Sequence, residues 1–415
     1  LGLTFTRKAA RELGVRIRQQ LNALASSAAF RAQASPEVLA SLEVIAPTTL
    51  TYDAYASEVV SNYGLLLPTE PGVTIMDGAT QWQLAWETAR NVTEIDVDIA
   101  PSTLASRIIE LGSNIDSNLS TPQAIREETE AFISNIEQTP QKGKREGLIG
   151  DLQGIVDKQR ERLEILPLVE QVRARCNEEN VATFGMQMAR AARLATDFAE
   201  VGEEERRRFK IIMLDEYQDT SHTQRLFLRA LFSGGCVTAV GDPMQAIYGW
   251  RGATAENLVQ FVNDFPRSDG QPAEKKQLTI SWRNPQSVLQ LANAVSDRAF
   301  AGQARTVEAL DAGPKAGQGE VQLAFTATGE EEVAYIADCM EAQLRECEAA
   351  GNKLDAAILV RTNAESAVYL EALSERGVPA IIVGLAGLLH LPEVMDITSV
   401  MKILVDPSSC LLYTS

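Results

Sequence analysis

The hydrophobic positions of this chain follow one recurring scheme, in which a short apolar run leads through a polar turn into residues of helical periodicity. After the opening run LGLTFT, apolar side chains recur every three or four positions through residue 24, which predicts an amphipathic helix. The scheme returns at three later runs, KIIML (210–214), CVTAV (236–240) and QLTIS (277–281). Short strands of this kind, separated by helices, are typical of a parallel sheet in an α/β protein.

The pattern changes in the middle of the chain, where polar residues with helical periodicity dominate and strand signals are weak. This stretch predicts a helical insertion into the first α/β domain. We therefore expect the first domain at residues 1–73 and 178–280, the insertion at 74–177, and a second α/β domain at 281–415. Within the second domain, three further apolar runs are predicted strands: EVQLAFT (320–326), AAILVRT (356–362) and PAIIVG (379–384).

Composition narrows the class of protein. The 415 residues are 45% hydrophobic and 23% charged, which is ordinary for a globular chain of two or three domains. The net charge of −18 argues against nucleic-acid binding through an overall basic field, although a local basic groove remains compatible with it. The five cysteines form no CxxC pair, so neither a zinc site nor a disulfide framework is indicated. The longest apolar run, 380–391, is too short to span a bilayer, and no membrane partner is expected.

Acidic residues directly follow the apolar run 210–214. Asp215 and Glu216 would stand at the carboxyl end of a strand, which is where open α/β sheets bind ligands. One carboxylate there could hold a hydrated Mg²⁺, while its neighbour orients a water beside a nucleotide phosphate. The alternative is a helix N-terminus that carries acids because the helix dipole favours them.

Five motifs in a fixed order decide between these readings: TFTRKAA (4–10), TLTYDAYA (49–56), LDEYQDT (214–220), VGDPMQAIYGWRGA (240–253) and SWRNP (281–285). In order, they resemble motifs Ia, Ib, II, III and IV of superfamily 1 DNA helicases of the UvrD/PcrA/Rep type. The resemblance implies an α/β fold of two RecA-like P-loop NTPase lobes, with the helical insertion in the first lobe. It also implies an ATP-dependent helicase or translocase that uses Mg²⁺ and moves 3′ to 5′ on single-stranded DNA in repair or recombination.

The resemblance assigns nucleotide-site roles to five residues. It places Asp215 on the metal and Glu216 on the attacking water. Gln245 would contact the γ-phosphate or its water, with capping of the local turn as the alternative. Arg283 would reach the γ-phosphate from the second lobe, with a surface ion pair as the alternative. Trp282, where the family commonly has Tyr, would stack on the adenine.

The resemblance also assigns a DNA-binding surface. Phe5 and Trp250 would stack on bases, which is a sequence-tolerant contact, although each could instead belong to the core. Arg7 and Arg251 stand beside these aromatics, where basic side chains would meet phosphates. Tyr52 is a further aromatic candidate, and Asp53 stands where the family often has His.

No GxxxxGK[ST] phosphate loop occurs in the 415 residues. In the family this loop comes just before motif Ia, and motifs V and VI lie beyond the last residues here. We therefore expect a fragment without meaningful ATPase activity of its own. Expected partners are single-stranded DNA, duplex junctions, and repair or nuclease proteins, in the cytoplasm and associated with the nucleoid. Two alternatives remain: the helicase subunit of a helicase–nuclease, and a non-catalytic DNA-binding relative.

Overall fold

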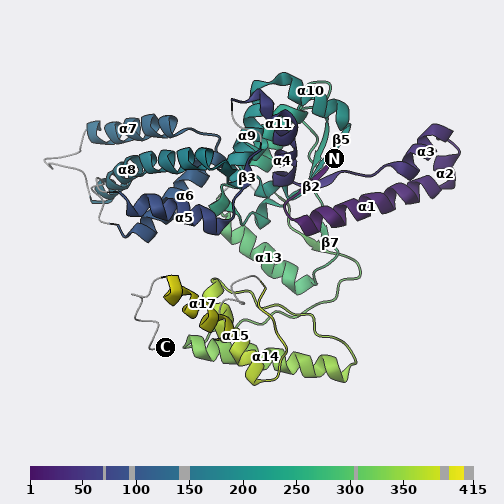
Figure 1. The fold of residues 1–415 in the computed structure, drawn as a ribbon. Coiled ribbons are helices and arrows are strands. Elements are labelled where there is room, and N and C mark those ends of the chain that lie inside the picture. Colours follow the sequence, from purple (N-terminus) through teal and green to yellow (C-terminus); the bar gives the residue numbers. More distant parts are fainter. Residues whose placement is uncertain (69–71, 93–98, 140–149, 303–306, 384–391, 406–415) are drawn as a thin grey trace. The chain divides into compact units, whose positions relative to one another are not determined.

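The computed structural model describes residues 1–68, 72–92, 99–139, 150–302, 307–383 and 392–405 (Figure 1). The chain divides into two compact units. The first comprises residues 1–281 and 292–311, and the second comprises residues 282–291 and 312–415.

A four-stranded parallel sheet organises the first unit. Its strand order is β2-β1-β5-β6, and its strands are β1 (Gly2–Thr4), β2 (Thr49–Thr51), β5 (Ile211–Leu214) and β6 (Cys236–Ala239). Leu3 of β1 pairs with Leu50 on one side and with Leu214 on the other, and both Leu3 and Leu214 are buried. The predicted parallel α/β sheet is therefore confirmed in this unit, and its central strands are the one that opens the chain and the one that precedes the acids.

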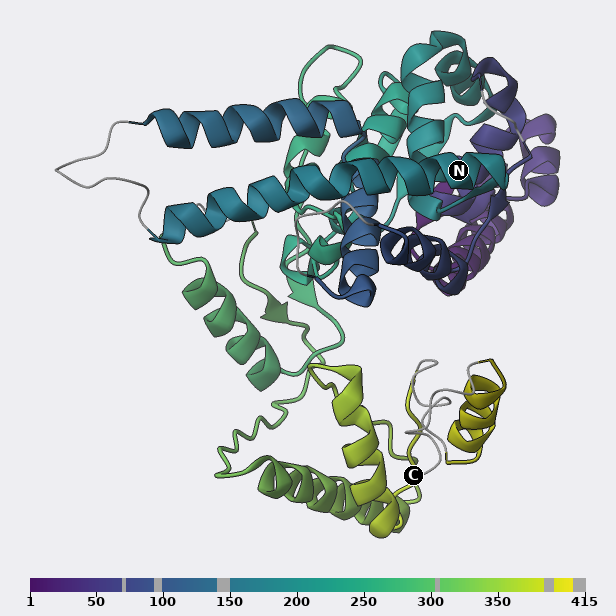
Figure 2. The same ribbon diagram turned by 60° about the vertical axis from the view of Figure 1, so that its left-hand side comes forward.

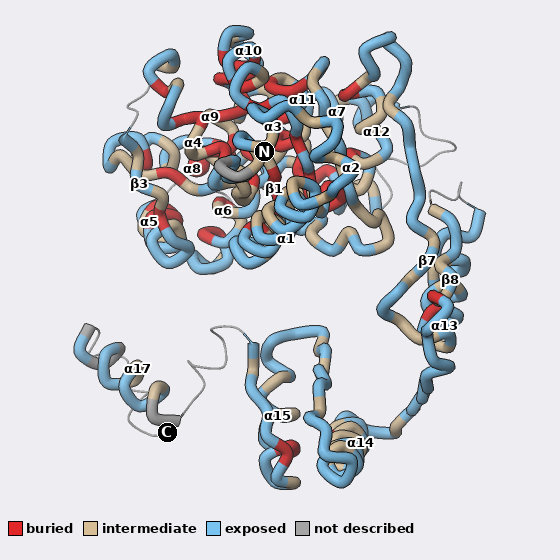
Figure 3. The backbone as a smooth tube through the Cα atoms, turned by 90° about the vertical axis from the view of Figure 1, so that its right-hand side faces the viewer, coloured by how far each residue is buried: buried red, intermediate tan, exposed pale blue. Residues whose placement is uncertain are grey.

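The first unit also contains helices, several of which pack on this sheet and supply most of the core. They are α1 (Arg7–Ser26), α2 (Ala28–Arg31), α3 (Pro36–Val44), α4 (Tyr52–Tyr63), α9 (Phe184–Asp197), α10 (Ala199–Arg208), α11 (His222–Phe232) and α12 (Glu256–Asp264). The core beside the sheet gathers Tyr55, Phe227 and Phe232, each no more than 1% exposed. In Figure 3, buried residues are dense along α9 and α11.

A helical segment leaves the first unit and returns to it through a short strand pair. β3 (Thr74–Ile75) runs parallel to β4 (Val181–Ala182), and between them lie α5 (Gly78–Arg90), α6 (Pro101–Ser117), α7 (Pro122–Gln138) and α8 (Gly150–Glu178). In both ribbon views α7 and α8 lie side by side (Figures 1 and 2). The segment has its own apolar cluster, which includes Ile108, Leu166 and Val169. Its position matches the stretch in which the sequence predicts an insertion, and the insertion boundaries themselves stay a prediction.

The remaining elements are β7 (Ile280–Ser281), paired with β8 (Asp311–Ala312), and the helices α13 (Gln286–Ala299), α14 (Gly329–Ala349), α15 (Ser366–Glu375) and α17 (Pro392–Val405). In the second unit, α14 and α15 pack together around Ala337 and Leu373. No helix in the described ranges combines the length and apolar character needed to cross a bilayer.

The strands predicted at 320–326, 356–362 and 379–384 do not form in the described residues, so these predictions are wrong there; residue 384 lies outside the described residues. Leu323 is 86% exposed and Leu359 is 93% exposed. Apolar alternation shows that a segment suits a sheet, but a strand is held by hydrogen bonds to a neighbouring strand. These segments have no such neighbour within the described part of the second unit.

Candidate functional site

Strand β5 delivers the acidic residues to the carboxyl end of the sheet. The strand is held centrally, because Asp215 N–H donates to Leu3 O at 2.8 Å and Val240 N–H donates to Leu214 O at 2.8 Å. The next residue, Glu216, has φ 53° and ψ 39°, in the left-handed region. A glutamate rarely adopts this conformation, which glycine, asparagine and aspartate tolerate better. Strained backbone of this kind concentrates at functional positions. The backbone therefore turns sharply just where the two acids stand.

Three acids gather at this strand end, Asp215, Glu216 and Asp219, and the charge of Glu216 helps to raise the pKa of each of the other two. Burial, followed by the charge of Glu216, raises the pKa of Asp215. The same two causes raise the pKa of Asp219, and Asp219 Oδ1 is buried without a hydrogen-bond partner. We call these three residues the strand-end acids. A cation would relieve both their repulsion and the cost of their burial.

The donor set at the strand-end acids fits Mg²⁺ in the way nucleotide sites use it. Mg²⁺ is usually bound by one or two carboxylates together with phosphate oxygens and waters. Among the described residues, no group of three or more His, Cys, Asp or Glu side chains could hold a metal by itself. A cation beside Asp215 would therefore take its other ligands from phosphate and water.

Gln218 connects the acids to the segment that follows β6. Its Nε2 donates to Glu216 Oε2 at 2.8 Å, and its Oε1 accepts from Asp242 N–H at 3.1 Å. A Cβ on Gly241 would lie 2.5 Å from Gln218 Oε1, so only glycine permits this approach. Gln218 was not among the residues predicted from the motifs; the signal for it in the sequence was its place between two acids in LDEYQDT.

Gln245 lies on this connected segment, in the short helix η3 (Pro243–Gln245). Its side chain is exposed, and its Nε2 donates to Asp242 Oδ2 at 2.9 Å. Asp242 Oδ1 in turn accepts from Met244 N–H at 2.9 Å. Gln245 therefore closes the local turn in this structure, and contact with a phosphate would require it to leave Asp242.

An aromatic cluster stands at the same end of the sheet. The rings of Phe5 and Tyr248 are parallel within 2°, with their centroids 6.3 Å apart. Trp250, in the short helix η4 (Gly249–Arg251), is 73% exposed and lies 6.4 Å from Tyr248. The Arg251 guanidinium lies 4.4 Å from the centre of the Trp250 ring. The structure thus brings together three of the predicted DNA-binding residues, Phe5, Trp250 and Arg251, and adds Tyr248.

The remaining DNA-binding predictions have different surroundings. Tyr52 is 2% exposed, packs under Phe5 with ring centroids 5.2 Å apart, and donates its hydroxyl hydrogen to Asp215 O at 2.8 Å. It therefore supports both the aromatic cluster and the acidic strand end from beneath. Arg7 is exposed at the first position of α1, next to the N-cap residue Thr6.

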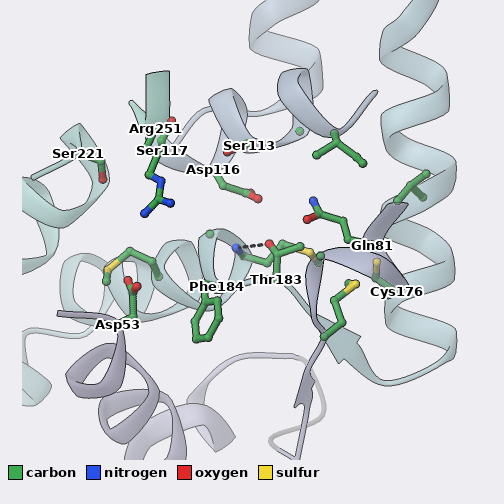
Figure 4. Close-up of a pocket in the computed structure, with 18 of the residues that line it drawn as sticks. Asp53, Gln81, Ser113, Asp116, Ser117, Cys176, Thr183, Phe184, Ser221 and Arg251 are labelled. Carbon is green, nitrogen blue, oxygen red and sulfur yellow. Dashed lines mark hydrogen bonds between the residues drawn. The ribbon is translucent and has the colours of Figure 1, made fainter. Parts of the chain in front are cut away.

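A cavity of about 660 Å³ opens beside the aromatic cluster, between the first-unit core and the helical segment. Figure 4 shows Asp53 and Arg251 reaching into it from different elements, with Asp116 and Gln81 on its far side. The polar wall therefore combines several acids with the arginine that covers Trp250.

Two predicted nucleotide-binding residues belong to the second unit. Trp282 and Arg283 directly follow β7, and both side chains are exposed, Trp282 by 74%. Their exposure leaves both side chains accessible to a ligand.

Comparisons with known proteins match most of the chain. The UvrD/REP helicase N-terminal domain matches residues 1–266, and the UvrD-like helicase C-terminal domain matches residues 277–412. The ATP-dependent DNA helicase UvrD1 of Mycobacterium tuberculosis is 29% identical over 252 residues, which cover 59% of this chain and 31% of that protein. DNA helicase II of Escherichia coli is 29% identical over 235 residues, covering 56% and 31%. The ATP-dependent DNA helicase PcrA of Staphylococcus epidermidis is 24% identical over 410 residues, covering 98% and 47%. The chain thus spans less than half the length of these relatives.

Proposed function

From the premise that this chain belongs to the UvrD-like family of helicases, we propose that it serves ATP-dependent translocation on single-stranded DNA. The observation that carries this proposal is that an acidic strand end and an aromatic cluster share one end of one sheet and are joined by hydrogen bonds. The proposed partners are single-stranded DNA and duplex junctions, and the proposed setting is DNA repair at the nucleoid.

The acidic side is the proposed nucleotide site. Bound Mg²⁺ would supply charge neutralisation at the phosphates. Asp215 would hold this cation, and Glu216, aimed by its left-handed backbone, would orient the attacking water. Gln245 would exchange Asp242 for the γ-phosphate or its water. Arg283 and Trp282 are the proposed contacts for the γ-phosphate and the adenine.

The aromatic side is the proposed DNA site. The rings of Phe5 and Tyr248 are parallel, with centroids 6.3 Å apart, so a base could stack against this pair of aromatic faces. The exposed ring of Trp250 offers a second stacking surface, worth roughly 1–3 kcal/mol per base. Arg7 and Arg251 are the proposed phosphate contacts.

Gln218 is the proposed mechanical link between the two sides. It binds Glu216 on one side and the backbone of Asp242 on the other. The segment that begins at Asp242 continues through Gln245 to Tyr248 and Trp250. A nucleotide that displaces Glu216 or Gln245 would therefore shift the base of the aromatic cluster, which couples hydrolysis to the grip on DNA.

The test is single-stranded DNA binding by this chain, measured by fluorescence anisotropy with a short labelled oligothymidylate. Trp250→Ala should weaken binding roughly 5- to 150-fold, because one stacking surface is lost. Trp82→Ala is the matched control, since Trp82 is 42% exposed but stacks on Trp86 in the helical segment. Equal affinities of the two variants would contradict the assignment of the aromatic cluster.

A further inference from the structure

Asp53 occupies an unusual place for an acid in a protein that binds DNA. It is the second residue of α4, after the N-cap Thr51, and it lines the cavity beside the aromatic cluster. Its side chain is half-buried. A helix start favours acids, but this one also faces the arginine that covers Trp250, and their opposite charges attract each other.

A fixed amide holds Asp53 in position. Gln224 belongs to the capping box of α11, in which Ser221 N–H donates to Gln224 Oε1 at 2.9 Å. This bond determines the orientation of the amide, because the acceptor oxygen must face the backbone donor. The Nε2 group is then the donor that remains for the Asp53 carboxylate: burial raises the pKa of Asp53, and the Gln224 side chain opposes this rise. Through Gln224, Asp53 is thus linked to Ser221, the residue that directly follows LDEYQDT.

Arg251 has two kinds of partner in this structure. Its guanidinium lies over the rings of Trp250 and Tyr248, at 4.4 Å and 5.4 Å from their centres, and it is attracted by the carboxylate of Asp53. Figure 4 shows the Arg251 guanidinium and the Asp53 carboxylate pointing into the same space. A DNA phosphate would offer the same guanidinium a third partner, of the same charge as Asp53.

We propose that Asp53 is a positioning residue that competes with the DNA backbone for Arg251. Without a strand, Asp53 holds the guanidinium against the aromatic cluster and keeps it ordered. When a strand binds, its phosphate replaces Asp53, and the lost attraction lowers the net affinity. The role of Asp53 is thus to keep the grip on DNA weak enough to be released at every step. This inference rests on the proposed function, because it requires single-stranded DNA as the ligand.

The experiment is a double-mutant cycle on the affinity for a labelled oligothymidylate. Asp53→Asn keeps the shape of the side chain and an acceptor for Gln224 but removes the charge. It should bind the oligonucleotide about 2- to 5-fold more tightly than the unaltered chain. In an Arg251→Ala background, the same change should alter the affinity less than about 2-fold, because the competitor has lost its target.

Two further variants separate this role from general effects. Asp77 lines the same cavity and is the N-cap residue of α5. Asp77→Asn is the control for net charge, because it removes the same charge as Asp53→Asn and asparagine caps a helix as well as aspartate does. It should leave the affinity near that of the unaltered chain. Asp53→Glu keeps the charge and should also remain near it, which provides a test should Asp53→Asn fold poorly.

The outcomes are distinguishable. Weaker or unchanged binding by Asp53→Asn overturns the competition, and so does tighter binding that persists without Arg251 or that Asp77→Asn reproduces. Failure of the unaltered chain to bind the oligonucleotide would remove the proposed function and this inference together. Binding that depends on Trp250 but not on Asp53 would remove the inference alone.

Discussion

Two sets of carboxylates in the first unit have opposite surroundings. Asp264 is 3% exposed and receives two hydrogen bonds from the Arg225 guanidinium, one of them at 3.0 Å from Nη2. Glu205 is 1% exposed and accepts from the hydroxyls of Tyr55 and Tyr63 at 2.7 and 2.9 Å. The strand-end acids, in contrast, crowd together, and two of them, Glu216 and Asp219, accept hydrogen bonds from the neutral amide of Gln218.

This difference distinguishes acids that stabilise the fold from acids that are available to bind a ligand. A buried acid with a built-in cation or donors is satisfied by the chain itself, and it holds helices together. Asp215 and Asp219, whose pKa values are raised by burial and by the charge of Glu216, would instead be stabilised by an arriving cation or ligand. Acids that destabilise the fold on their own account are therefore the better candidates for function.

The largest expected effect is on the scaffold side. Asp264→Asn would leave the partly buried Arg225 without its counterion, which should lower the free energy of unfolding by about 3 kcal/mol. Urea unfolding followed by circular dichroism measures this change. Asp269→Asn is the control, because its partner Arg267 is 60% exposed and the pair should contribute less than about 1 kcal/mol. Equal losses in the two variants would erase the distinction between scaffold and surface pairs.

A smaller effect of opposite sign is expected at the strand end. Burial and the charge of Glu216 raise the pKa of Asp215, so the folded protein keeps this proton at pH values where the unfolded chain has lost it. Below the ordinary aspartate pKa of about 3.9, Asp215 is neutral and does not lower the free energy of unfolding. As the pH rises from there through the raised pKa, ionisation of Asp215 lowers the free energy of unfolding progressively. Asp215→Asn should thus stabilise the fold at neutral pH by less than about 1 kcal/mol, because water screens the charge of this partly exposed side chain.

The measurement is the difference in unfolding free energy between Asp215→Asn and the unaltered chain across a series of pH values. The gain should shrink toward zero as the solution becomes acidic, because both proteins then carry a neutral side chain at this position. A loss of stability at neutral pH would mean that Asp215 is held by interactions of the scaffold kind.

The smallest expected effect comes from the cation itself. Mg²⁺ should stabilise the unaltered chain by about 0.4 kcal/mol at a concentration equal to its dissociation constant. Asp215→Asn should show no such gain, and NaCl at matched ionic strength serves as the control for screening. A thermal shift that Mg²⁺ produces equally in both proteins would place the cation elsewhere.

The sequence predicted those parts of the first unit that depend on local pattern. The strand runs at 210–214 and 236–240, with their following turns, appear where expected, because they pair with neighbours inside the same unit. The runs at 320–326 and 356–362 have the same apolar character yet form no strand. Local pattern states a preference, whereas pairing depends on a partner elsewhere in the fold.

The candidate site was predicted unevenly for a related reason. Phe5 and Trp250 could be named from motifs, but the parallel placement of Tyr248 against Phe5 arises from two segments far apart in the chain. Tyr52 has the same aromatic character as Phe5, yet it points inward because its hydroxyl has a backbone acceptor at the end of β5. Which aromatic faces outward is decided by such tertiary contacts.

The two-residue pair of β3 and β4 holds the start and the end of the helical segment next to each other. Thr74 N–H donates to Asn180 O, and Met76 N–H donates to Ala182 O, so departure and return lie side by side. Chain inserted between adjacent points leaves the host connectivity unchanged. A change in the length of the chain between these two points would therefore leave the register of the four-stranded sheet unchanged.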